Sequence, residues 1–215
     1  MTNKNDNSLR QHLMYATLPN IVLGFHGCDK SVFDKILYEH EPFRPSENDY
    51  DWLGHGMYFW EQNLERAWEW AKSGQTNPKL HIKTPAVIGA VIDLGFCLNL
   101  IDSNNIQLLK NQYKIFELEM FIADKPIRRN QNLKDNTDLL LRYLDCAVIE
   151  DLHEERSVNG EVPFDSVRGV FFEGKPIYES SGFMEQSHIQ ICVRNPNCIK
   201  GFFAPKPVDE SWRIV

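Results

Sequence analysis

The sequence predicts an α+β fold in which short strands at both ends of the chain flank a helical block. Runs of β-branched and aromatic residues, bounded by glycine and polar turn residues, lie before residue 98 and after residue 165. The stretch from about 98 to 155 instead shows the apolar spacing of helices. Because strands and helices occupy separate parts of the chain, we expect an antiparallel-rich sheet rather than an alternating parallel one.

The first part of the chain predicts three strands and two helices. The strands are expected over residues 20–27, 57–60 and 85–95, and the helices over residues 29–40 and 62–72. Asp29 or Ser31 can cap the first helix, because short polar side chains accept hydrogen bonds from the free N–H groups of a first turn. Val32, Ile36 and Leu37 are expected to face the core from that helix.

The rest of the chain predicts two longer helices and then three strands. The helices are expected over residues 104–124 and 136–155, joined by the basic loop 125–134, and the strands over 166–174, 187–194 and 198–205. Residues 1–19 are polar and are expected to form a flexible N-terminal segment. No internal repeat and no linker divides the sequence, so residues 1–215 are expected to form a single domain.

The composition is that of an ordinary globular protein. Apolar residues make up 42% and charged residues 25%, enough for a core of normal size. The net charge of -7 argues against a wide nucleic-acid footprint, which leaves only the basic loop 125–134 as a local candidate. There is no run of 18 apolar residues and no apolar stretch near the N-terminus, so we expect a cytoplasmic protein without a membrane partner.

Several common sites are not indicated by the sequence. The five cysteines are scattered without a C-x-x-C pair, so free buried thiols are expected rather than disulfides or a metal site: Cys28, Cys97, Cys146, Cys192 and Cys198. The glycine patterns of dinucleotide-binding folds and P-loops are missing too. A nucleotide would therefore have to be bound in another way.

Two stretches place a histidine among glycines next to an apolar strand. "GFHGCD" ends the first strand at His26 and Gly27, and "LGHGMYFW" places His55 just before the second strand. Glycine lets a ligand approach the backbone closely, but it serves turn geometry equally well. Strand alternation puts Tyr58 and Trp60 on one face and Phe59 on the other. Either Phe59 belongs to the core while Tyr58 faces a cleft, or all three rings fill the core.

These residues resemble the catalytic domain of ADP-ribosyltransferases, in the branch that includes diphtheria toxin and the poly(ADP-ribose) polymerases. That family's first strand ends in His-Gly, and its second motif reads G-x-G-[IM]-Y-F with an alanine nine residues after the tyrosine. The matching residues here are Gly54, Gly56, Met57, Tyr58, Phe59 and Ala67. The third motif is a strand that normally begins with a catalytic glutamate, and "SHIQICV" resembles it with Gln190 at that place.

The resemblance covers residues 21–73 and 165–204 and implies a split, antiparallel-rich sheet with the helical block as an insertion. It also implies a site for NAD+ as substrate, without a metal. In such a site His26 bonds a ribose hydroxyl, the Gly27 backbone holds the nicotinamide carboxamide, and Tyr58 stacks on the nicotinamide ring. Gln190 would be the third catalytic residue.

This sequence departs from the family pattern at three positions. Arg66 replaces a serine that bonds the carboxamide in many relatives, and Glu69 replaces a second stacking tyrosine. Gln190 is neutral, and loss of the glutamate in the family usually goes with transfer of a single ADP-ribose. Glu185, on the preceding loop, is its rival for the acidic role, and His188 shares the strand face of Gln190.

Further residues complete the expected site. Arg44 meets the NAD+ diphosphate or is a solvated loop arginine, and Gly56 belongs to the loop that passes the cofactor. His55 faces the adenosine half or the acceptor. Cations of the basic loop contact a macromolecular acceptor or are simply exposed: Lys125, Arg128, Arg129 and Lys134.

The resemblance implies a mono-ADP-ribosyltransferase that cleaves NAD+ and modifies a macromolecule, in the manner of a toxin or defence effector. The acceptor is a protein or a nucleic-acid base, and an antitoxin or regulatory protein is a possible partner. The alternatives are a non-catalytic module that binds NAD+ or ADP-ribose, and a structural domain whose aromatic residues all belong to the core.

Overall fold

The computed structural model describes residues 21–77, 80–132 and 138–214, and this part of the chain has an α+β fold. The strands are β1 (Ile21–Asp29), β2 (Met57–Glu61), β3 (Pro85–Asp93), β4 (Cys97–Asn99), β5 (Ser166–Phe171), β6 (His188–Val193) and β7 (Ile199–Phe203). The helices are α2 (Lys30–Leu37), α3 (Leu64–Gly74), α4 (Ser103–Ile122) and α5 (Tyr143–Val158), and a 3-10 turn spans Pro196–Cys198.

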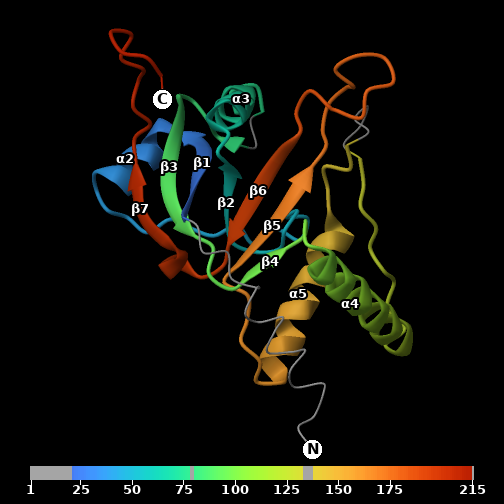
Figure 1. Cartoon of the computed structure of the whole chain (residues 1–215). Helices are drawn as coiled ribbons and strands as arrows, with labels where there is room; N and C mark the ends of the chain where they lie inside the picture. Colours follow the sequence, from blue (N-terminus) through green and yellow to red (C-terminus); the bar gives the residue numbers. More distant parts are fainter. Residues whose placement is uncertain (1–20, 78–79, 133–137, 215) are drawn as a thin grey trace, which may run out of the picture.

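The strands form one seven-stranded sheet in the order β4-β5-β6-β2-β1-β3-β7. All neighbours are antiparallel except β4 and β5, which are parallel. Figure 1 shows α2 at the β7 edge of the sheet and α4 and α5 beside β4 and β5 at the other edge. The order brings β1, β2 and β6, which carry the sequence motifs, together at the centre of the sheet.

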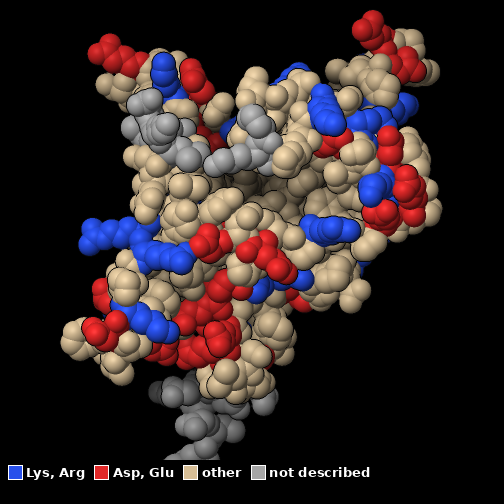
Figure 2. All heavy atoms as spheres, turned by 180° about the vertical axis from the view of Figure 1, so that it is seen from behind, with Lys and Arg blue, Asp and Glu red and all other residues tan. Residues whose placement is uncertain are grey.

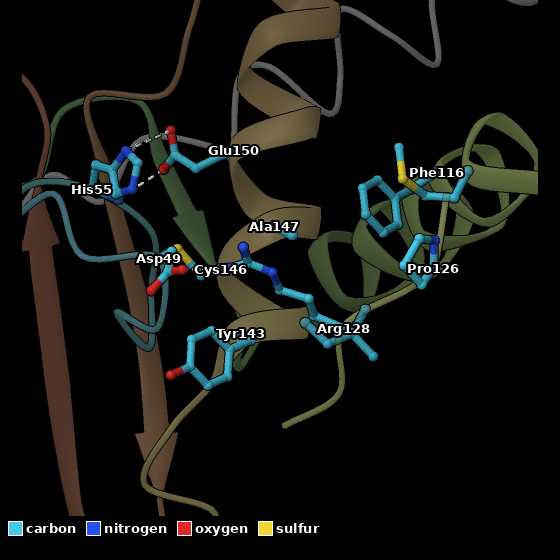
Figure 3. Close-up of a pocket in the computed structure, with 11 residues that line it drawn as sticks. Asp49, His55, Phe116, Pro126, Arg128, Tyr143, Cys146, Ala147 and Glu150 are labelled. Atoms are coloured by element: carbon cyan, nitrogen blue, oxygen red, sulfur yellow. Dashed lines mark hydrogen bonds and ion pairs between the residues drawn. The ribbon is translucent and has the colours of Figure 1, made fainter. Parts of the chain in front are cut away.

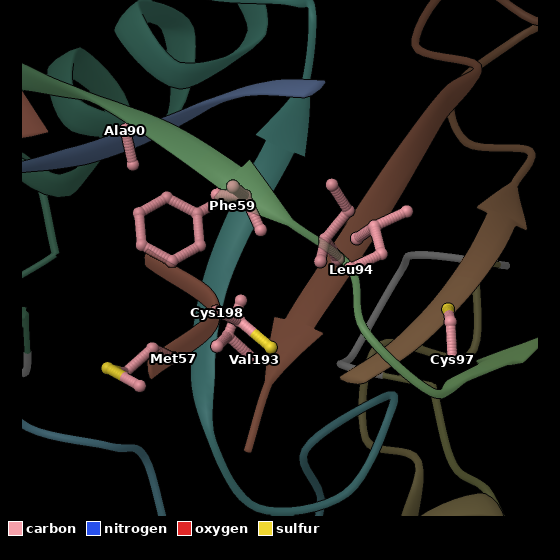
Figure 4. Packing of buried hydrophobic residues seen from close by; sticks show 9 residues of the cluster. Met57, Phe59, Ala90, Leu94, Cys97, Val193 and Cys198 are labelled. Carbon is pink, nitrogen blue, oxygen red and sulfur yellow. The ribbon is translucent and has the colours of Figure 1, made fainter. Parts of the chain in front are cut away.

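The two faces of the sheet carry different layers. Tyr58 and Trp60 point to the face that packs against α3 and α5, which we call the helix face. Phe59 points the other way and is fully buried with Met57 and residues of β3 and β6 (Figure 4). The alternation expected along β2, and the core role of Phe59, are therefore confirmed.

The first helix begins as expected at Asp29, whose side chain accepts a hydrogen bond from the Ser31 N–H at 3.0 Å. The expected core face of α2 is partly wrong. Val32 is 39% exposed, whereas Phe33 packs beside the buried Ile36. The helix is thus rotated so that its aromatic ring, which offers more apolar surface than valine, covers the sheet.

The helical block is confirmed, but it starts later than expected. Residues 97–99 form the short strand β4, which pairs with β5 and makes the sheet mixed. The last long helix begins at Tyr143, and residues 138–142 precede it without helical structure. None of the described helices combines the length and apolar character that a membrane span requires.

The five cysteines are free and buried, as expected. Burial raises the pKa of each thiol, to about 12 for Cys28, so these side chains remain uncharged. The flexible segment expected at 1–19 lies outside the described residues.

Candidate functional site

The hydrogen-bond ladder between β1 and β2 ends at the first His-Gly pair, and we call this interruption of the sheet the opening. The register of these strands runs through Gly24↔Glu61 and Phe25↔Trp60 and ends there, although β1 stays paired to β3 as far as Asp29. The Leu23 carbonyl points toward β2 and accepts a hydrogen bond from the Gln62 N–H at 2.8 Å. Since peptide directions alternate along a strand, the N–H and C=O of Gly27 also point toward β2, where the ladder has ended.

His26 stands at the edge of this opening and is half-buried. Its Nδ1 lies 2.8 Å from the Tyr58 carbonyl, and its ring contacts those of Phe43, Phe59 and Trp70, with centroids 4.7, 6.0 and 6.4 Å away. Burial lowers the pKa of His26, so the ring is neutral at pH 7. Because Nδ1 then donates its proton to the carbonyl, Nε2 is left as a hydrogen-bond acceptor.

Gly27 is required by the packing of α3. A Cβ at this position would lie 2.3 Å from the Ala67 carbonyl oxygen and 3.2 Å from the Ala71 and Trp70 side chains. The helix therefore lies directly on the strand at the place where the sequence predicts a backbone contact to the carboxamide. The small residues Ala67 and Ala71, both fully buried, make this close approach possible.

Tyr58 is more firmly tied to the protein than a free stacking ring. Its hydroxyl donates to the Gly54 carbonyl at 2.6 Å and accepts from the Leu53 N–H at 2.8 Å. The half-buried ring packs with a cluster that includes Leu53 and Ile149. Burial raises the pKa of Tyr58 well above its usual range, so the hydroxyl stays protonated.

Gln190 lies on the helix face, next to the motif of β2. It pairs with Trp60 on one side and with Gly169 on the other. Glu185 is exposed in the segment between β5 and β6, and its N–H donates to the Lys175 carbonyl at 2.9 Å. Of the two rivals for the third catalytic role, Gln190 is thus the one on the strand beside Trp60.

A charged cluster lies at the start of β6, and it contains a buried carboxylate that the sequence did not indicate. Glu173, which follows β5, is 5% exposed, and its Oε2 accepts a hydrogen bond from Arg66 Nη2 of α3 at 2.7 Å. The same Oε2 lies 3.9 Å from Nδ1 of His188, which is two residues before Gln190. The one sequence signal was an acidic residue directly after an aromatic strand end, which says nothing about burial.

The second His-Gly pair is held entirely by the protein. The His55 N–H donates to Glu150 Oε1 at 2.7 Å, and the His55 carbonyl accepts from Arg194 at 3.0 Å. The Gly56 N–H and C=O bond the Ser46 backbone at 3.0 and 2.7 Å. Burial raises the pKa of Glu150, but hydrogen bonds from Arg194 and the His55 N–H more than offset this and leave it below its usual value.

A pocket of about 300 Å³ lies on the α5 side of this loop, beside His55 and Glu150 (Figure 3). Phe116 and Leu144 form part of its apolar wall, and Arg128 and Tyr143 lie at its margin. The structure therefore brings His55 and the basic loop together, but in a pocket whose lining contains none of His26, Tyr58 and Gln190.

The remaining cations lie at the surface. Arg128 forms an ion pair with Asp49 and stands 5.7 Å from the centre of the Tyr143 ring, so its charge is already balanced. Arg44 is exposed on the loop before Ser46, and Lys125 and Arg129 are exposed too. Lys134 lies outside the described residues. Within the described ranges, no group of three or more His, Cys, Asp or Glu side chains could hold a metal ion.

Comparison with known proteins identifies one relative without a known activity. No protein-family model matches the chain. Over 194 residues it is 26% identical to the uncharacterized protein MJ0359 of Methanocaldococcus jannaschii, a match that covers 82% of this chain and 83% of that protein. This similarity extends over most of both chains.

Proposed function

We propose that this protein is an NAD+-dependent mono-ADP-ribosyltransferase with its site at the opening between β1 and β2. The observation that carries the proposal is the end of the β1–β2 ladder at the His26–Gly27 pair. Backbone groups freed there can bond a ligand, and Trp60 and Gln190 lie side by side on the neighbouring strands. The interrupted ladder and the mostly antiparallel sheet also fit the split sheet that the sequence resemblance implies.

His26 and Gly27 fit the roles expected from the resemblance, whereas the ring of Tyr58, expected to stack on nicotinamide, is already packed inside the protein. A neutral His26, with its Nδ1 occupied by the Tyr58 carbonyl, offers Nε2 as an acceptor for a ribose hydroxyl. Gly27 offers its N–H and C=O to the carboxamide. The backbone carbonyl of Tyr58 lies at the opening, where it accepts the hydrogen bond from His26. The Tyr58 hydroxyl holds the preceding loop through its hydrogen bonds to the Leu53 N–H and the Gly54 carbonyl.

The reaction would break the bond between ribose C1′ and the nicotinamide nitrogen. The bonding electrons leave with nicotinamide, which becomes neutral, and C1′ acquires the positive character of an oxocarbenium ion until the acceptor attacks it. A site that clamps the ring and the ribose lowers this barrier by orientation. Gln190 orients a ribose hydroxyl but supplies no negative charge, which favours transfer of a single ADP-ribose.

The acceptor that we favour is a protein. Arg128, the central cation of the basic loop, is paired with Asp49. Figure 2 shows basic and acidic side chains interspersed on the back of the molecule, with acidic ones gathered over α4 and α5. Such a surface lacks the continuous positive charge that nucleic-acid phosphates attract.

The test is incubation of the purified chain with NAD+ labelled on the adenylate, with a cell lysate as the source of acceptors. We expect release of nicotinamide and label that protease removes. Label removed by nuclease would identify a nucleic-acid base as the acceptor instead. NAD+ binding without nicotinamide release would favour a non-catalytic module, and no binding would contradict the proposal.

A further inference from the structure

Three buried polar atoms without a hydrogen-bond partner gather between α3 and β6. The described part of the chain has five such side-chain atoms: Arg142 Nε and His153 Nε2 belong to the start and the body of α5, and the three that gather here are Trp60 Nε1, Arg66 Nε and His188 Nε2. Buried polar groups are nearly always paired, because an unpaired one loses its bonds to water without replacement. Three such atoms in one place therefore point to a ligand group that pairs with them.

The surrounding contacts place these three side chains in one cluster. The ring centroids of Trp60 and His188 are 6.3 Å apart, and Trp60 packs against Ala67, the neighbour of Arg66 on α3. Arg66 and His188 both approach Glu173, at 2.7 and 3.9 Å. Gly27 lies against the Ala67 carbonyl, so the cluster adjoins the opening between β1 and β2.

The free atoms match the two sides of an amide. His188 Nδ1 donates its proton to the Gln186 carbonyl at 2.7 Å, so its Nε2 carries a lone pair. Trp60 and Arg66 offer N–H groups. An amide presents an oxygen that accepts and an NH2 group that donates, whereas a carboxylate only accepts.

The charged part of the cluster is a buried ion pair. The side chains of Arg66 and Glu173 are 14% and 7% exposed, so each charge depends mainly on the other for its stabilisation. Arg66 Nη1 also lies 3.3 Å from Oε2 of Glu69, a weaker partner because its side chain is 56% exposed. An uncharged group can enter such a site without disturbing the pair, but an anion would meet Glu173 in a poorly solvated place. Arg66 is the most exposed of the three side chains, so it is the part that must move for entry.

We propose that the Arg66–Glu173 pair, with Trp60 and His188, makes the site selective for the uncharged carboxamide of NAD+ over a carboxylate. This inference rests on the proposed function and assigns a specificity-determining role to residues outside the sequence motifs. It predicts that the preference for NAD+ over its carboxylate analogue decreases when Glu173 loses its charge and increases when Arg66 loses its charge.

The experiment measures dissociation constants by calorimetry for NAD+ and for its analogue with a carboxylate in place of the carboxamide. The wild type should prefer NAD+ by about tenfold or more. Glu173→Gln removes the buried partner of Arg66 and leaves it only the exposed Glu69, so the preference should fall by about tenfold. Arg66→Gln leaves Glu173 unpaired and should increase it by a similar factor, about tenfold. The matched control is Glu179→Gln, an exposed carboxylate of the same segment, which should leave the preference unchanged.

Circular dichroism establishes that each variant is folded. If a single variant fails to fold, the double variant Arg66→Gln/Glu173→Gln, in which both charges of the buried pair are removed, should bind with the preference of the wild type. An unchanged preference in the single variants, or the same change in Glu179→Gln, would overturn the inference and leave the proposed function standing. A wild type that binds neither dinucleotide would overturn both.

Discussion

The dipeptide His-Gly occurs twice near the motifs, and the two copies have opposite environments. At His55–Gly56 the protein itself bonds the backbone, through Glu150, Arg194 and Ser46. At His26–Gly27 the ladder to β2 has ended, and the peptide groups of Gly27 face an opening. The same two residues thus serve loop structure in one place and a candidate ligand site in the other.

The comparison shows that a glycine in a loop and a glycine at a ligand site differ in whether their backbone N–H and C=O groups are already hydrogen-bonded within the protein. A glycine whose N–H and C=O are already paired inside the protein offers a ligand only its surface. A glycine at an interrupted ladder offers two polar groups that must find a partner. Glycine is needed at both positions, because a Cβ would collide with the Ala67 carbonyl at Gly27 and with the Val193 carbonyl at Gly56.

The largest expected effect is a loss of stability at the His55–Gly56 pair, whose backbone is bonded by the protein itself. Glu150→Ala removes the partner of Arg194 and of the His55 N–H, leaving a cation whose side chain is 20% exposed without its carboxylate. Loss of one partner of a buried pair should lower the free energy of unfolding by about 3 kcal/mol. Urea unfolding measures this. Asp49→Ala breaks the exposed pair with Arg128 and should cost less than about 1 kcal/mol; equal costs would contradict the structural role of Glu150.

The next effect separates the two glycines. Gly27→Ala and Gly56→Ala both force a Cβ against backbone, at 2.3 and 2.6 Å, and each should cost about 1–3 kcal/mol of stability. They should differ in NAD+ use, because only Gly27 lies at the opening. Nicotinamide release per folded molecule should fall sharply in Gly27→Ala and stay near wild type in Gly56→Ala. The reverse pattern would move the site to the second loop.

A smaller effect compares the two histidines. His26→Ala removes the hydrogen bond that we propose to a ribose hydroxyl and should weaken NAD+ binding by about 0.5–1.5 kcal/mol. His55→Ala should leave binding unchanged, since His55 lies at a pocket that excludes the motif residues. Thermal shifts with and without NAD+ report both. Equal weakening in the two variants would show that the cofactor reaches the second loop, as the sequence also allowed.

Much of the fold could be predicted from the sequence, because apolar periodicity reports burial directly. Strand β3 and helix α3 lie where their patterns predict. The pattern failed at Val32, where two candidate core residues were adjacent and only packing against the sheet could choose between them. It also missed β4, whose three residues are too few to show alternation.

The candidate site was only partly predictable, because motifs name residues but not their partners. His26 was singled out by the glycines around it and Gln190 by the resemblance to the third motif, and both lie on strands at the centre of the sheet. Glu173 has no motif, and its burial depends on Arg66, which is 107 positions away along the chain. The hydroxyl bonds of Tyr58 likewise arise from a loop conformation that the residue pattern does not specify.

The smallest expected effect concerns the protonation of His26 and sharpens its assignment to the opening. Burial lowers the folded pKa of His26 below its ordinary value of 6.5. As the pH falls, His26 therefore takes up a proton in the unfolded chain before it does so in the folded protein. The free energy of unfolding is thus unaffected by this group above pH 6.5 and decreases below pH 6.5, until the folded ring is protonated too. Between pH 8 and pH 6 the wild type should lose at most about 0.8 kcal/mol more than His26→Gln. Urea unfolding at both pH values measures the difference, in which the contributions of His153 and His188, whose pKa values are also lowered by burial, cancel. A wild type that loses no more than the variant would mean that water reaches His26 freely, and the opening would then be wider than the contacts with Phe43 and Trp70 indicate.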